Sequence, residues 1–229
     1  GARLGILRES IGLNSEPDSG DYQKIQEVFD KAVDELKAAG AEIVDPVVIP
    51  NIKELLAKRS GAPGETHESF KNYYGRSAKA PFKTPEEAIA HPDFAKVVKR
   101  SQDRFKRNPD AAKHYESLRA QDQLMTNFLK VMADHKLDAI VHKAVEHQPT
   151  LIKDGIAPPF TDQKGAPHLN TFLVYVPTIV VPAGFTRDNL PAGVCFIGRP
   201  YDDGNLIKFA YAYEQATRHR KPPASTTGL

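Results

Sequence analysis

The chain has 229 residues, which is enough to bury a sizeable core as one large domain or two small ones. Its hydrophobic fraction of 40% and charged fraction of 26% are those of an ordinary globular protein. A net charge of +2 is too balanced to indicate nucleic acid or an anionic membrane as a partner.

The single cysteine, Cys195, excludes an internal disulfide and agrees with a reducing compartment, so we expect a cytoplasmic protein. No apolar run approaches the roughly 18 residues of a membrane span, and no membrane partner is expected. No signal peptide is recognisable, and the chain leads directly into the apolar residues 4–7. A start inside a strand is what a piece of a longer protein would show, and we expect such a piece.

The first fifty residues predict a strand, a helix and a second strand. Residues 3–7 are apolar, and residues 21–39 place apolar side chains at the spacing of an amphipathic helix. Gly40 stands where a helix cap belongs, and residues 42–49 carry the β-branched side chains of a strand. This order is a βαβ unit, which implies a parallel pair of strands.

A helical excursion is predicted over about residues 50–135. Thr84 and Glu87 form a capping-box pattern, and residues 108–110 are typical of the start of a longer helix. Residues 58–80 look irregular. The apolar stripe expected on the longer helix consists of Tyr115, Leu118, Leu124, Met125, Phe128, Leu129 and Met132.

The last third predicts three strands and a helix. Residues 137–141 are a short buried strand, followed by a loop of about 35 residues, a length that is usually functional. Residues 179–181 and 192–197 predict an antiparallel hairpin, and residues 203–219 a final helix. The side chains expected on the buried face of that helix are Leu206, Ile207, Ala210, Tyr211 and Thr217.

The end of the chain carries the most specific sequence pattern. It includes Pro-Thr-Ile-Val-Val-Pro-Ala-Gly-Phe-Thr at residues 177–186 and Asn-Leu-Pro-Ala-Gly-Val at residues 189–194. It continues through Gly-Arg-Pro-Tyr at residues 198–201 and similar short segments up to residue 223. This pattern closely resembles the C-terminal end of the amidase signature family of serine hydrolases. The resemblance covers the whole chain weakly and its last 50 residues strongly.

The resemblance implies an α/β fold, with a mixed sheet of about five strands flanked by helices, as in the C-terminal half of the amidase signature fold. Residues 1–229 would be a single unit, a partial amidase domain, with a loose tail at residues 221–229. In the family, both halves of the chain build one sheet around one core. This piece is therefore expected to present an apolar face to a missing N-terminal half, or to self-associate.

Family members hydrolyse carboxylic amides with a Ser, cis-Ser, Lys triad near a Gly/Ser-rich stretch. The nearest stretch here, residues 60–64, has one serine and an internal proline, and it does not match. No catalytic residue can therefore be assigned, and the chain alone is predicted to be inactive. The resemblance implies that this part of the protein contributes walls of the cleft and of the pocket for a small amide substrate. Residues 142–176 are the suspected substrate-binding region.

Two departures from the family pattern fall inside this region. His142 and Lys143 stand near the place where the family usually has Pro-Thr, and Tyr175 replaces a small residue. Individual substrate-binding residues are therefore left open.

Other chemistry finds weaker support in the sequence. His142, His147 and His168 share a proline-rich region, but they lack the spacing and the fourth ligand of a metal site, so no metal or cofactor is expected. Cys195 lies in an apolar strand, which favours a buried thiol over a nucleophile. A Ser-His-Asp triad has no fixed spacing and stays open, although no Gly-x-Ser-x-Gly elbow or phosphate loop occurs.

The basic residues between 96 and 113 alternate with aspartates and favour a solvated helix face.

Three rival interpretations remain: a stand-alone binding or inhibitory protein on an amidase-derived scaffold, an enzyme with a new site near the histidines, and a product of proteolysis. Elemental analysis distinguishes an enzyme with a new histidine site from the amidase interpretation, because the amidase interpretation includes no stoichiometric transition metal.

Overall fold

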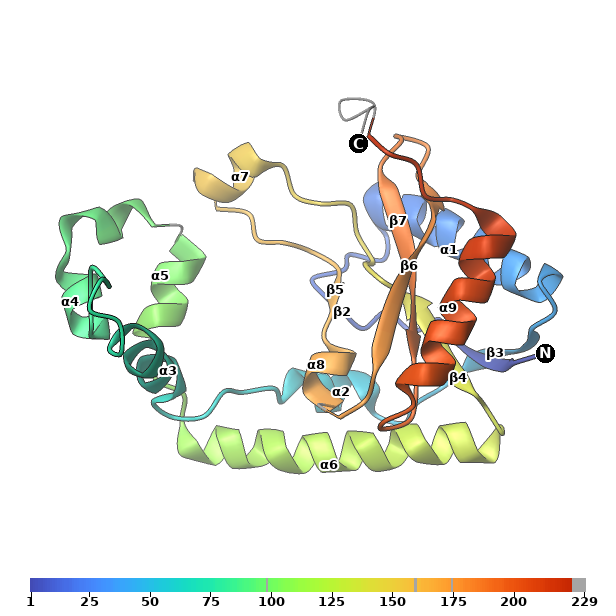
Figure 1. The fold of residues 1–229 in the computed structure, drawn as a ribbon, viewed down its shortest axis with the longest axis horizontal. Coiled ribbons are helices and arrows are strands. Elements are labelled where there is room, and N and C mark those ends of the chain that lie inside the picture. The colour runs from blue at the N-terminus through green and yellow to red at the C-terminus, as the bar shows by residue number, and fades with distance from the viewer. Residues whose placement is uncertain (98, 159, 174, 224–229) are drawn as a thin grey trace. The chain divides into compact units, whose positions relative to one another are not determined.

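The computed structural model in Figure 1 describes residues 1–97, 99–158, 160–173 and 175–223, without the side chain of Arg100. Contacts divide the chain into two compact units. Unit 1 comprises Gly1–Leu56, Gln121–Pro149 and Lys164–Leu229, and unit 2 comprises Ala57–Ala120 and Thr150–Gln163. That residues 1–229 act as one unit, with a helical excursion over about 50–135, stays a prediction.

A mixed five-stranded sheet in the order β3-β1-β4-β7-β6 forms the centre of unit 1. β1 is parallel to both of its neighbours, β3 and β4, whereas β7 is antiparallel to β4 and β6. This arrangement confirms the α/β class, the parallel pair and the hairpin. The strands are β1 (Arg3–Leu7), β3 (Glu42–Val47), β4 (Ala139–Lys143), β6 (Thr178–Phe185) and β7 (Pro191–Ile197).

Helix α1 (Gly20–Ala38) connects β1 to β3. Its N-cap is Ser19, whose hydroxyl oxygen accepts a hydrogen bond of 3.1 Å from the backbone N–H of Tyr22. Gly40 adopts a φ of +92°, which a residue with a side chain rarely reaches, and it ends the helix where the sequence predicts. The buried stripe consists of Tyr22, Ile25, Val28, Phe29, Ala32, Val33 and Leu36.

Helix α9 (Asp203–Thr217) packs with α1 against β6 and β7 (Figure 1). The predicted buried face of α9 is wrong in part, because Ile207 and Tyr211 are 59% and 62% exposed. Tyr213 is buried instead, in the same core as Leu206 and Ala210. Its hydroxyl donates 2.8 Å to Glu35 Oε2, and this partner makes burial of the polar end possible.

A second group of buried side chains comes from α2 (Ile52–Ala57), α6 (Ala111–Asp134) and α8 (Leu169–Leu173). Asp110 caps α6 by accepting 2.6 Å from the N–H of Ala112, so the helix starts where predicted. Tyr115 and Leu118 of the predicted stripe are exposed, because they lie in the part of α6 that belongs to unit 2. The buried members of this group include Ile52, Leu55, Leu124, Phe128, Met132, Leu169, Phe172 and Leu173.

Unit 2 contains short helices with little buried surface. They are α3 (Glu65–Tyr74), α4 (Pro85–Ala90), the 3₁₀ helix η1 (Pro92–Lys96), α5 (Lys99–Lys106) and α7 (Ile152–Ile156). The prediction of an irregular segment at 58–80 is wrong, since it contains α3. None of the residues of α3 is buried, so it carries no apolar stripe that the sequence could reveal. Thr84 caps α4 as predicted.

The long loop expected after β4 contains three short elements. These are α7, α8 and β5 (Ala166–Pro167), which pairs antiparallel with β2 (Gly12–Leu13). Of the tail at residues 221–229, the first three residues have no regular structure and residues 224–229 lie outside the described part. In the residues that are described, no helix combines the length and apolarity needed to cross a membrane.

Replacing Ser19 with alanine removes the N-cap of α1 and should lower the free energy of unfolding by about 1 kcal/mol. For a chain of this size, the melting temperature should fall by about 2–4 °C in a calorimetric scan. Ser69→Ala is the control, because this serine is exposed within α3 and its removal should change little. Equal melting temperatures for both variants would contradict the assignment of the cap.

Candidate functional site

Polar side chains gather in unit 1 where β1 and β4 end. These strands are parallel neighbours, so their carboxyl ends meet at the same edge of the sheet, a common place for sites in α/β proteins. Arg8 and Ser10 follow β1, and Lys143 is the last residue of β4. Further buried polar side chains follow β4 directly, namely Glu146, His147 and Gln148.

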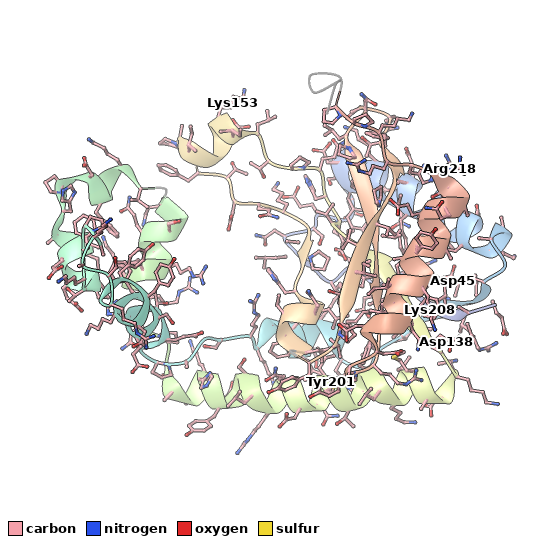
Figure 2. All side chains as sticks on the ribbon, in the orientation of Figure 1. Asp45, Asp138, Lys153, Tyr201, Lys208 and Arg218 are labelled. Atoms are coloured by element: carbon pink, nitrogen blue, oxygen red, sulfur yellow. The ribbon has the colours of Figure 1, made fainter. Side chains whose placement is uncertain are left out.

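Arg8 fixes the end of β1 to its surroundings. Its guanidinium donates 2.6 and 2.7 Å to the two carboxylate oxygens of Asp45 on β3, which Figure 2 labels. It also donates 2.6 Å to Asp30 of α1. These hydrogen bonds raise the pKa of Arg8, and the cation ties strand and helix together in a fixed geometry.

Lys143 is a buried amine with only 1% of its surface exposed. Its Nζ donates 2.6 Å to the hydroxyl oxygen of Tyr22 and 2.7 Å to Oε1 of Gln26, which are both neutral acceptors. The amine also lies 4.3 Å from the ring centroid of Tyr22. Burial lowers the pKa of Lys143 below its ordinary 10.5, while the charge of Glu146 opposes this shift.

Glu146 is equally buried, and its carboxylate accepts four hydrogen bonds. The donors are the backbone N–H groups of Ile11 and Gly12 and the hydroxyls of Ser10 and Ser15. The carboxylate therefore has its own set of donors, separate from the acceptors Tyr22 and Gln26 that bind the ammonium of Lys143.

The three histidines of the sequence analysis do not form a metal centre in the described part of the chain, where no group of three or more potential ligands occurs. His142 Nδ1 lies 2.7 Å from the carbonyl oxygen of Lys143, so this nitrogen carries the proton. Its Nε2 is buried without a protein partner, and burial lowers the pKa of His142. His147 Nε2 lies 3.6 Å from a carboxylate oxygen of Glu16.

Cys195 is the cross-strand neighbour of His142, on β7. Its thiol is buried and lies 3.8 Å from the carbonyl oxygen of Phe196. Burial raises the pKa of Cys195 to about 12, so the thiolate needed for nucleophilic attack is not formed near neutral pH. The interpretation of Cys195 as a buried thiol is confirmed.

The family is decided by comparison with known sequences. A family model with the description Amidase matches residues 2–207.

The chain belongs to the amidase family.

The relatives of this amidase-family chain are considerably longer. It is 27% identical to a probable amidase of Arabidopsis thaliana over 218 residues, which cover 89% of the chain and 39% of the relative. It is 29% identical to a glutamyl-tRNA(Gln) amidotransferase subunit of Brucella anthropi, covering 97% of the chain and 46% of that protein. The chain thus spans less than half the length of these curated relatives.

Solved structures show the same relation. The crystal structure of PAM12A superposes with a TM-score of 0.70 at 25% identity, over 97% of this chain and 44% of that one. The peptide amidase of Stenotrophomonas maltophilia gives a TM-score of 0.63 at 25% identity, over 99% of this chain and 45% of that one. The fold predicted from the resemblance is confirmed.

The suspected region of this amidase-family chain, residues 142–176, is divided between the two units. Residues 142–149 and 164–176 belong to unit 1 and residues 150–163 to unit 2. In unit 1, the N–H of Glu146 donates 2.8 Å to the carbonyl of Gly165, whose own N–H donates 2.6 Å to the carbonyl of Leu13. The polar cluster around Glu146 was not predicted, although charged residues at the end of a buried strand and directly after it, such as Lys143 and Glu146, are a visible signal for it.

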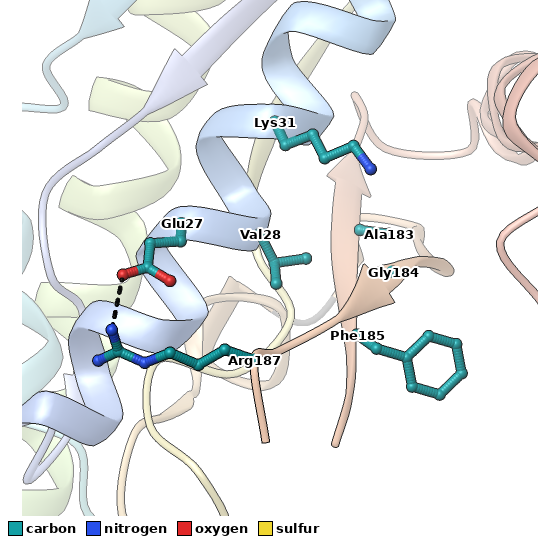
Figure 3. Close-up of a pocket in the computed structure, with 7 residues that line it drawn as sticks. All are labelled: Glu27, Val28, Lys31, Ala183, Gly184, Phe185 and Arg187. Carbon is teal, nitrogen blue, oxygen red and sulfur yellow. Dashed lines mark ion pairs between the residues drawn. The ribbon is translucent and has the colours of Figure 1, made fainter. Parts of the chain in front are cut away.

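An open pocket of about 190 Å³ lies elsewhere in unit 1, between α1 and β6 (Figure 3). Arg187 pairs with Glu27 at 3.6 Å across it. Its lining side chains offer no buried nucleophile or base, so it does not supply amidase chemistry.

The basic run at 96–113 carries exposed ion pairs such as Lys99 with Asp103, as a solvated face would.

Replacing Lys143 with methionine should change how stability depends on pH. In the wild type, the folded state holds this amine at a lowered pKa, whereas the unfolded state keeps about 10.5. Between these values the unfolded state binds more protons, so the free energy of unfolding rises with pH. Lys143→Met should remove this rise, so the free energy of unfolding of wild type should increase relative to that of the variant as the pH approaches 10.5 from below.

Urea unfolding at several pH values measures this difference. Lys153→Met is the matched control, because Lys153 is an exposed lysine of α7 and loses no burial when it is replaced. Parallel stability curves for wild type and Lys143→Met would show that burial does not lower the pKa of Lys143.

Proposed function

We propose that this chain is the C-terminal part of an amidase whose complete form hydrolyses carboxylic amides to an acid and ammonia or an amine. The observation that carries the proposal is the family match over residues 2–207, combined with coverage of only 39% and 46% of two relatives. Its cytoplasmic location is a further prediction, supported by a single buried cysteine.

The chain by itself is proposed to lack amidase activity. The resemblance assigns the serine nucleophile, the bridging serine and the lysine base to a Gly/Ser-rich segment, and the 229 residues contain no such segment. Lys143 does not replace the base, because its amine is buried and bonded to Tyr22 and Gln26. Cys195 does not replace the nucleophile, because its thiol is buried and protonated.

Residues 142–176 are proposed to contribute walls of the substrate pocket. In unit 2, helix α7 supports this, since Ile152 is 80% exposed and Leu151 and Ile156 are exposed as well. Large apolar side chains grouped on so short a helix are typical of a binding surface. They suit the apolar part of a small amide substrate. No residue is assigned to contact with the amide group itself.

An apolar face on unit 1 is proposed to bind either the remaining half of the amidase or a second copy of this chain. β6 is the last strand of the sheet in the described part of the chain, and an edge strand offers backbone groups with which another strand can pair. On α9, whose two ends lie near the labelled Tyr201 and Arg218 in Figure 2, Ile207 and Tyr211 point away from the core. Such side chains are costly to expose, so a partner that covers them stabilises the chain.

The purified chain should release no ammonia or amine from simple carboxylic amides in a coupled assay. Wild type is compared with Lys143→Met and Cys195→Ala, and traces of a contaminating amidase would act equally in all three. Turnover that survives unfolding, repurification and refolding, and that disappears in either variant, would overturn the proposed lack of activity.

Replacing Ile207 and Tyr211 together with glutamate should weaken self-association without lowering stability, because both side chains are exposed. Sedimentation velocity at increasing concentration should show a shift from larger species in wild type toward monomer in the variant. The matched control, Ala212→Glu, adds a charge at an exposed position of the same helix. If wild type is already monomeric at high concentration, the proposed use of this face by a second copy is wrong.

A further inference from the structure

The carboxylate of Glu146 is bound in an unusual way for a buried anion. Oε1 accepts 2.8 Å from the N–H of Ile11, and Oε2 accepts 2.9 Å from the N–H of Gly12 and 2.7 Å from the hydroxyl of Ser10. The hydroxyl of Ser15 is a further donor to Oε2. Within the described residues, no arginine or lysine forms an ion pair with this carboxylate. Its direct partners are N–H and O–H groups, and the ammonium of Lys143 acts on it only at longer range.

The donors all come from one short loop, residues 10–15, which is 131 to 136 residues away from Glu146 in sequence. Consecutive backbone N–H groups that converge on one point form an anion-binding nest. Two hydroxyl donors at the same point make the nest specific for an acceptor with several lone pairs, such as a carboxylate.

Packing holds this loop in its shape. Gly12 has no room for a side chain, since a Cβ there would lie 2.6 Å from Ser15 Oγ and 2.7 Å from the carbonyl of Gly165. Ile11 is buried, and the carbonyl of Leu13 accepts from Gly165. Because these contacts do not involve the Glu146 side chain, the loop retains them when that side chain is absent.

We propose that residues 10–15 form a carboxylate-binding site, which the chain fills with its own Glu146 side chain. The tethered carboxylate fixes the segment after β4 to the loop after β1. When the side chain is removed, a small free carboxylate occupies the same donors. This inference does not depend on the proposed amidase function, because binding and stability report on it directly.

Acetate rescue of Glu146→Ala tests the site. The variant should melt about 5–10 °C below wild type in chloride, because four donors lose their acceptor. Replacing chloride by 100 mM acetate at constant ionic strength should restore about 3–5 °C, for a dissociation constant on the order of 10 mM. The acetate effect should saturate, and serine-to-alanine replacement of Ser15 in the same variant should reduce it.

Gln148→Ala is the matched control. Gln148 is buried two residues from Glu146 and its loss also leaves a space, but its partners are Lys24 and Thr186 and not the loop. Acetate should leave the melting temperatures of this control and of wild type unchanged. A rise in the control or in wild type equal to that in Glu146→Ala, or no rise in any protein, would overturn the proposal.

Glu146→Gln provides a second test that does not depend on folding of the alanine variant. Glutamine keeps the volume of the side chain, but its NH₂ group cannot accept the hydrogen bonds made to one carboxylate oxygen. Amide hydrogen exchange of Ile11 or Gly12 should accelerate at least tenfold over wild type. If both amides keep the wild-type exchange rate, Glu146 merely fills space and the carboxylate site is refuted.

Discussion

The parallel pairing of β1 and β4 is the constraint on which the polar cluster depends. It joins residues more than 130 positions apart and brings two strand ends to one edge of the sheet. Charged side chains lie at or directly after both strand ends. Burying them there costs free energy unless each one has hydrogen-bond partners nearby. Arg8 is satisfied by two aspartates, Glu146 by a loop, and Lys143 by neutral acceptors on α1. Each of these three charged groups therefore has its own hydrogen-bond partners. Arg8, Glu146 and Lys143 form no ion pair with one another.

Arg8 forms ion pairs with its aspartates, but Lys143 and Glu146 are bound by neutral partners and not by each other. A buried ammonium next to a carboxylate gains attraction, but both ions lose their hydration. Here Lys143 donates to Tyr22 and Gln26, whereas Glu146 accepts from residues 10–15, so each charge has its own short hydrogen bonds and the two charges interact at longer range. The ammonium of Lys143 also forms a cation–π contact with the ring of Tyr22. The position of α1 is thereby coupled to the end of β4 as well as to the core.

Much of the fold could be predicted from the sequence because its patterns are local. The stripe of α1, the glycine that ends it and the apolar strands give clear periodicities, and the pattern at the C-terminal end indicates the family. Helix α3 could not be found, since none of its residues is buried and it therefore has no stripe. Tyr213 was not distinguished from Tyr211 because its burial depends on Glu35, a partner far away in sequence. The polar cluster was missed for the same reason: Ser10 and Ser15 look like ordinary loop residues until Glu146 lies beside them.

The distance in sequence between the loop and Glu146 has a consequence for the order of folding. Loop closure over more than 130 residues is slow relative to helix formation, and contacts of this range are made late. Helix α1 can form as soon as its residues are available, whereas residues 10–15 have no carboxylate until β4 has paired with β1. During synthesis, residues 10–15 leave the ribosome well before Glu146 and reach their final conformation only after it has emerged. Residues 10–15 are therefore a natural place to look for proteolytic sensitivity in chains whose synthesis has not yet reached Glu146.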